Sequence, residues 1–118
     1  MDFHDLEIWK MGMKITKDVY QYTSNFPKSE IYGLTSQMRR AAVSIPSNIA
    51  EGNGRCYQKE YIQFLHISQG SLLELMTQLE LSKDLKFLSE KDFTLIIDKC
   101  TQLNKMLRSL IKNLKNRV

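Results

Sequence analysis

Apolar residues return at helical spacing along most of this chain, and the pattern breaks at only three places. In the third segment Leu65, Leu72 and Leu79 stand seven residues apart. One broad helical face of the last segment carries eight apolar residues: Phe93, Ile96, Cys100, Leu103, Leu107, Leu110, Ile111 and Leu114. A face of that width is typical of a bundle helix rather than of a narrow two-stranded coiled coil.

The three breaks carry the residues that end or start helices. They span residues 24–27, 51–54 and 85–88. Pro27 cannot continue a helix, and we expect Gly52 to close the second helix as a C-cap glycine. Ser89, with Asp92 three residues later, indicates a capping box that opens the last helix.

Four helical segments joined by short connections favour antiparallel neighbours. With only 2 prolines and 5 glycines, the chain lacks the turn residues of a β-sandwich or barrel. The 118 residues suffice for one domain with its own core. The sequence therefore predicts an all-α, antiparallel up-down-up-down four-helix bundle, a single domain over residues 1–118. We expect Asp5 and Ser29 to be the N-caps of the first two helices.

The composition is close to that of an ordinary globular domain, with 42% hydrophobic and 25% charged residues. The longest apolar runs are only a few residues, so we expect no membrane span. The first residues, MDFHDLEIWK, lack the basic and apolar regions of a secretory signal. These features predict a cytoplasmic protein.

Nothing in the sequence supports catalysis, a cofactor or a metal. His4 and His66 are far apart and fit no metal-ligand spacing such as HExxH. Cys56 and Cys100 form no CxxC pair, and Cys100 is expected to be a small buried residue. The chain has neither a phosphate-binding GxxxxGK[ST] loop nor a GxSxG turn. We therefore expect a protein that is not an enzyme.

The net charge of +4 is concentrated near the C-terminus. A basic stripe of Lys105, Arg108, Lys112 and Lys115, spaced 3, 4 and 3 residues apart, lies on one side of the last helix. A smaller stripe on the first helix consists of Lys10, Lys14 and Lys17. Such stripes can be solvated faces that favour the helix dipole, or they can bind phosphates. No aromatic residues are interleaved with them, so nucleic-acid contacts would be to the backbone and indifferent to sequence.

A polar stripe runs along the second helix. It consists of Gln37, Arg40, Ser44, Asn48 and Glu51. The stripe can be a solvated surface, or a hydrogen-bonded network to another helix or between subunits. Pro46 lies inside this helix and removes the bond that its N–H would give to the carbonyl of Ala42.

The third helix carries signs of self-association. Gly70 and Ser71 interrupt it with small residues, which indicates close approach of another helix. Four apolar residues also lie outside its main seam: Ile62, Ile67, Leu73 and Met76. One bundle cannot easily bury all of them, which points to an oligomer.

Several runs resemble a known family. They include Phe3-His4-Asp5-Leu6 with Trp9, LTSQMRRAAVSIPSNIAEG at residues 34–52, and Gly70-Ser71-Leu72. These runs resemble the four-helix-bundle proteins encoded in intervening sequences of bacterial 23S ribosomal RNA genes. More distantly, the chain is similar to the accessory variability protein of diversity-generating retroelements. The resemblance implies a small cytoplasmic bacterial protein that forms a homopentamer, and for the retroelement relatives it implies binding to nucleic acid and to a reverse transcriptase.

Two functional hypotheses follow. The first is weak, sequence-independent binding of RNA or DNA through the two basic stripes. The second is an oligomeric scaffold, for example a reverse-transcriptase accessory, that recruits a protein partner without touching nucleic acid. The resemblance assigns the polar stripe of the second helix a structural or interfacial role. It does not extend to the C-terminal basic stripe.

Overall fold

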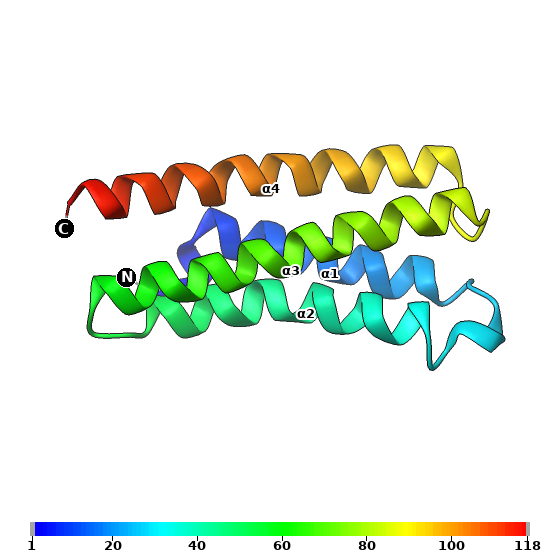
Figure 1. The fold of residues 1–118 in the computed structure, drawn as a ribbon, viewed down its shortest axis with the longest axis horizontal. Helices are drawn as coiled ribbons and strands as arrows, with labels where there is room; N and C mark the ends of the chain where they lie inside the picture. The colour runs from blue at the N-terminus through cyan, green and yellow to red at the C-terminus, as the bar shows by residue number, and fades with distance from the viewer. Residues whose placement is uncertain (1, 118) are drawn as a thin grey trace.

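The computed structural model describes residues 2–117, and its four helices lie side by side (Figure 1). The helices are α1 (Glu7–Thr23), α2 (Leu34–Asn53), α3 (Gln58–Asp84) and α4 (Glu90–Asn116). Two short 3-10 turns, η1 (Phe3–Asp5) and η2 (Lys28–Glu30), precede α1 and α2. Each helix packs against the next in the chain, and α4 closes the ring by packing against α1. No strand occurs within residues 2–117, which confirms the all-α four-helix bundle.

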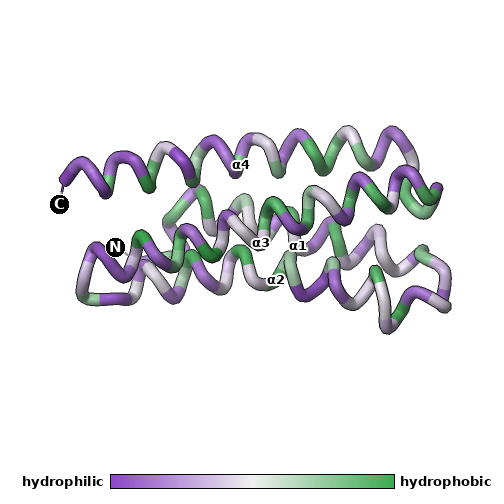
Figure 2. Tube along the Cα trace, in the orientation of Figure 1, coloured by the Kyte–Doolittle hydropathy of each residue, from purple (hydrophilic) through white to green (hydrophobic). Residues whose placement is uncertain are grey.

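The core is formed by the faces that the periodicity marks. Ile8, Ile15 and Val19 are buried on α1, and every apolar residue of the α4 face is buried or packed against the core. Figure 2 shows that hydrophobic and hydrophilic residues alternate along each helix rather than falling in blocks. Cys100 is fully buried, and this burial raises the pKa of its thiol to about 12, as expected of an inert core residue.

The sequence predicts the start of α4 correctly but not the start of α1. Ser89 accepts a hydrogen bond from the backbone N–H of Asp92 at 3.1 Å, which confirms Ser89 as the N-cap of α4. Asp5 is not the cap of α1, because it lies within η1 and the helix starts after Leu6. The short turn moves the start of the helix beyond the reach of the Asp5 side chain.

A second 3-10 turn displaces the start of α2 in the same way. Ser29 lies inside η2, so the prediction that it caps α2 is wrong. The helix begins at Leu34, and the carboxylate of Glu30 accepts the backbone N–H of that residue at 3.2 Å. An acidic side chain at a helix N-terminus also favours the helix dipole.

Gly52 has a different role from the one expected. It does not end α2, which continues to Asn53, and it is buried within the helix. A Cβ atom at Gly52 would lie 2.7 Å from Cβ of Phe64 and 3.0 Å from the ring of Tyr61. The glycine therefore allows α2 and α3 to approach closely beside the loop that joins them.

Gly70 does not have the role that Gly52 has. A Cβ atom at Gly70 would meet nothing within 4 Å, and the residue is exposed on the outside of α3. Within the chain the prediction that another helix approaches Gly70 is therefore wrong. Its neighbour Ser71 faces α2, so the small residues do not form one patch.

Helix α2 runs through Pro46 without interruption because α1 supplies a substitute donor. The hydroxyl oxygen of Thr16 lies 3.0 Å from the carbonyl oxygen of Ala42, the group that the proline leaves without an N–H. It also lies 2.8 Å from the carbonyl oxygen of Gly12, so one proton is shared between two acceptors. A Cβ atom at Gly12 would lie only 3.4 Å from Pro46, so α1 packs closely on this part of α2.

A pair of glycine substitutions tests these contacts. Gly52→Ala should lower the free energy of unfolding by about 1–3 kcal/mol, because the new methyl group overlaps Phe64. Gly70→Ala is the matched control and should raise the free energy of unfolding of a single chain by up to about 1 kcal/mol, because within the chain the new methyl group meets nothing and helix propensity improves. Urea denaturation of the two variants measures both values, and equal effects would contradict the assigned roles.

A threonine pair tests the donor to Ala42. Thr16→Val keeps the side-chain shape and removes the hydroxyl, so it should cost about 1–2 kcal/mol of stability. Thr101→Val is the control, since the exposed Thr101 hydroxyl bonds only to the carbonyl of Ile97 in its own helix, and its cost should stay within about 0.5 kcal/mol. Thermal unfolding at matched concentrations compares the two variants. A Thr16→Val protein as stable as the control would show that Ala42 does not need the hydroxyl.

Candidate nucleic-acid interface

The C-terminal part of α4 and the N-terminal part of α3 form the two sides of an open groove of about 690 Å³. Both helices have 27 residues and run antiparallel, so these two ends meet. The side-chain amide of Gln58 donates to the carbonyl oxygen of Leu114 at 2.6 Å and ties the ends together. The groove is lined by His66, Gln69, Lys105, Arg108, Ser109, Ile111, Lys112, Lys115 and Asn116.

All four cations of the predicted α4 stripe line this groove. Lys105 and Lys115 are ten residues apart, which is about 15 Å along the helix. Their spacing follows from the buried seam of α4, because Leu107, Ile111 and Leu114 face the core and leave the charged positions to one side. The stripe that the sequence marks on a single helix is therefore one wall of a groove between two.

No carboxylate lines the groove, and none of the four cations forms an ion pair within residues 2–117. The chain contains no acidic residue after Asp98. The negative end of the α4 dipole offsets part of the repulsion among these charges. The positive potential of the groove is otherwise uncompensated and is available to an anionic partner.

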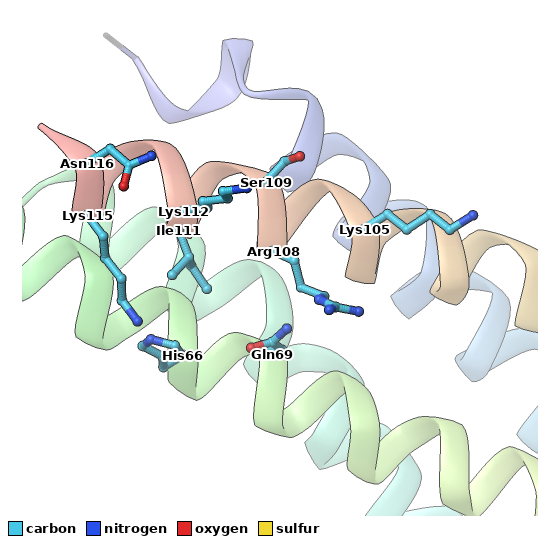
Figure 3. A pocket seen from close by; sticks show the side chains of 9 residues that line it. All are labelled: His66, Gln69, Lys105, Arg108, Ser109, Ile111, Lys112, Lys115 and Asn116. Atoms are coloured by element: carbon cyan, nitrogen blue, oxygen red, sulfur yellow. The ribbon is translucent and has the colours of Figure 1, made fainter.

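The cations do not all point the same way. Figure 3 shows Arg108 and Lys115 reaching toward α3, where Gln69 and His66 stand, whereas Lys105 points away along the outer lip. Gln69 is held in place by α4, because its amide nitrogen donates to the side-chain oxygen of Asn104 at 3.1 Å. Two cations thus face a polar opposite wall.

The lysines of α1 lie outside this groove. Lys10 and Lys14 line a separate hollow between α1 and α4, together with Glu7. The ammonium of Lys10 lies 3.4 Å from the carboxylate of Glu7, and Lys17 lines neither hollow. The two predicted basic stripes therefore do not form one continuous surface around the groove.

The polar stripe of α2 is only partly hydrogen-bonded within the chain. The hydroxyl groups of Ser44 and Ser71 lie 2.8 Å apart and link α2 to α3. The side-chain amide of Asn48 donates to the carbonyl and hydroxyl oxygens of Ser44 at 2.8 and 2.9 Å. Glu51 instead pairs with Arg55 at 2.6 Å on the surface.

The remaining members of the stripe face solvent. Gln37 and Arg40 line a hollow between α2 and α3, together with Ser44, Ser71 and Glu74. In the part of the chain that the structure describes, neither the Gln37 nor the Arg40 side chain makes a hydrogen bond or an ion pair. In this hollow the hydroxyls of Ser44 and Ser71 bond to each other, whereas the side chains of Gln37 and Arg40 have no partner within the described residues.

A comparison with family models matches residues 4–109 to the family described as 23S rRNA-intervening sequence protein. The chain belongs to this family. The match includes Lys105, Arg108 and the α3 wall of the groove, whereas Lys112 and Lys115 lie beyond it. A comparison with curated proteins finds no match.

A comparison with solved structures confirms the four-helix fold. The chain is similar to a protein with unknown function from the S23 ribosomal protein family of Bacteroides thetaiotaomicron VPI-5482, with a TM-score of 0.81. The two share 22% sequence identity over 89% of this chain and 98% of that chain. At this identity the likeness shows the bundle and carries no residue roles.

Helix α3 exposes less surplus apolar surface than the sequence indicates. Ile62 and Met76 pack partly against the core. Ile67 and Leu73 remain about half exposed, at 52% and 48%.

The described part of the chain contains neither a cluster of metal-ligating side chains nor a membrane-spanning helix. No group of three or more His, Cys, Asp or Glu side chains comes together among residues 2–117. Within that range, no helix combines the length and the hydropathy needed to cross a bilayer.

His66 and Gln69 form the α3 side of the groove, and the sequence did not predict either of them as a site residue. They stand three residues apart on α3, a spacing that places both on one side of a helix. That spacing becomes informative only once the antiparallel register places this part of α3 beside the end of α4.

Proposed function

We propose that this protein is a non-enzymatic, cytoplasmic RNA-binding protein that holds phosphate backbones in the groove between α3 and α4 without reading sequence. The observation that carries the proposal is the set of four cations that line one groove with no carboxylate among them. Phosphate contacts from Lys and Arg supply the sequence-independent part of nucleic-acid affinity. The absence of aromatic rows beside the cations favours backbone contacts over base recognition.

One subunit on its own would bind weakly. If each of the four cations neutralises one phosphate, the logarithm of the binding constant falls with the logarithm of salt at a slope of about −2.8 for single strands. A symmetric assembly repeats the groove and turns several weak contacts into one useful affinity. Binding and self-association therefore belong to the same proposal.

We also propose that the assembly is the homopentamer that the family resemblance implies. Support comes from Ile67 and Leu73, which leave apolar surface exposed on the outside of α3. Gly70 lies between them in sequence with open space in front of it, so a second chain can approach the backbone there. Closed cyclic symmetry would repeat one such contact around the ring.

A second candidate function is an oligomeric scaffold that recruits a protein, such as a reverse transcriptase, and does not bind nucleic acid. The hollow between α2 and α3 favours it, because Gln37 and Arg40 present unpaired hydrogen-bonding groups there. Glu74 adds an unpaired charge of the opposite sign on the α3 side. A protein surface with both charges can meet this hollow more readily than a polyanion can.

Charge reversal in the groove separates these functions. Arg108→Glu combined with Lys115→Glu should weaken binding of a short single-stranded RNA at least about tenfold at 50 mM salt and make the salt slope shallower. Lys14→Glu combined with Lys17→Glu changes the net charge equally but outside the groove, so its affinity should stay within about twofold of wild type. Fluorescence anisotropy over a salt series measures both. Equal losses of affinity in the two variants would indicate a general effect of net charge rather than a binding site in the groove. If wild type does not bind RNA at low salt, the scaffold function is favoured.

Light scattering tests the assembly. Five copies of the 13.8 kDa chain should give a mass of roughly 69 kDa at micromolar concentration. Ile67→Glu should reduce that mass, whereas Leu95→Glu, at a site on α4 exposed to a similar extent, should not. A wild-type mass near that of one chain would refute the assembly, and an unchanged mass for Ile67→Glu would refute the contact through α3.

A further inference from the structure

The groove contains one side chain whose charge can change near neutral pH. His66 stands on α3 and is exposed on the wall opposite the basic stripe, with Lys115 reaching toward it (Figure 3). The charged groups that line the groove with it are Lys105, Arg108, Lys112 and Lys115 of α4, and the other lining residue of α3 is the neutral Gln69. Neither α1 nor α2 contributes a lining residue.

The imidazole of His66 has no competing partner in the chain. Among residues 2–117 it makes no hydrogen bond or ion pair, and no carboxylate lines the groove beside it. His4, the other histidine, is already engaged, because its Nδ1 lies 2.8 Å from the carboxylate of Asp2. This contact with His4 also lowers the pKa of Asp2. The two histidines therefore differ in what they can offer a ligand.

A phosphate in the groove changes the electrostatic balance at His66. In the empty groove, an imidazolium at His66 would face the positive charge of Lys115 with no anion between them (Figure 3). A phosphodiester held between Arg108 and Lys115 on one side and His66 on the other reverses this balance, because it attracts the imidazolium. Proton uptake and phosphate binding then favour each other.

We propose that His66 is a binding residue of this groove and that it makes the affinity for single-stranded RNA rise as the pH falls. The inference rests on the proposed function of the α3/α4 groove and adds a fifth contact from the second helix. A charged imidazole contributes a phosphate contact, and low pH favours that form. A neutral imidazole contributes no such charge, and binding then depends on the four α4 cations alone.

Single-stranded RNA fits this groove better than a duplex, because it can contact both the α4 cations and the His66 ring of α3. His66 is the one aromatic ring among the nine lining residues, and it stands clear of the core. The backbone of a flexible strand can follow the groove floor at Ile111, and an unpaired base can stack on the ring. A duplex keeps its bases paired inside and offers the ring no such surface. The phosphodiester groups of RNA stay fully ionised across this pH range, so the pH dependence reports on the protein.

The test compares three full-length proteins: wild type, His66→Gln and the matched control His4→Gln. The probe is a twelve-nucleotide oligouridylate with a terminal dye whose emission does not change between pH 5.5 and 7.5. Fluorescence anisotropy is recorded at both pH values over a salt series. Circular dichroism at both pH values shows that each protein keeps its helices.

Wild type and His4→Gln should bind about fivefold more tightly at pH 5.5 than at pH 7.5 in 0.1 M salt, and their salt slopes should steepen by about 0.7, which is one added phosphate contact on a single strand. His66→Gln should match wild type at pH 7.5 and show no gain at pH 5.5. A gain that survives in His66→Gln, or wild-type binding that does not depend on pH, would overturn the inference.

The outcomes also distinguish this inference from the proposed function. If wild type binds equally at both pH values while Arg108→Glu with Lys115→Glu still abolishes binding, His66 is not a contact but the groove remains the binding site. If wild type fails to bind the oligonucleotide at either pH, both proposals fail. An NMR titration of the His66 ring with and without RNA gives a second readout, since a bound phosphate should move its midpoint to higher pH.

Discussion

The groove depends on one constraint, the continuous apolar seam that holds two helices of equal length antiparallel. Leu65 on α3 and Leu107 and Ile111 on α4 are buried in that seam. Helix α1 has only 17 residues and its first turn lies near Met106, so the last turns of α4 extend past it and rest on α3 (Figure 1). Burial of the apolar face therefore decides where the cations stand, and the length difference leaves them uncovered.

Periodicity was sufficient to predict the helices because every helix here buries one face in a common core. The N-cap at Ser89 could also be predicted from the sequence, since it needs only residues within one turn. Asp5 and Ser29 were wrong as caps because each lies in a 3-10 turn, and such a turn has no strong pattern of its own. The role of Gly52 depends on Phe64 across the α2–α3 contact, which no local pattern in α2 encodes.

The candidate site divides in the same way. The cations of α4 were found from their spacing, because one helix is enough to align them. Gln69 and His66 could be placed only once the register between α3 and α4 was known. The lysines of α1 looked equivalent in sequence, but Glu7 beside Lys10 and the separate hollow give them different surroundings. Local spacing thus predicts the α4 side of the groove, whereas the α3 side can be identified only from the tertiary structure.

The hydroxyl of Thr16 beside Ala42 fixes the axial alignment of the first two helices. Pro46 leaves the carbonyl of Ala42 on α2 without its usual donor, and in the observed register the Thr16 hydroxyl of α1 lies 3.0 Å from it. A slide of α1 by one turn, about 5.4 Å, would place Gly12 or Tyr20 there instead and remove the Thr16 hydroxyl from the Ala42 carbonyl. Pro46 therefore favours the register of α1 and α2 in which Thr16 stands beside Ala42. The identities of positions 16 and 46 are expected to change together in related chains.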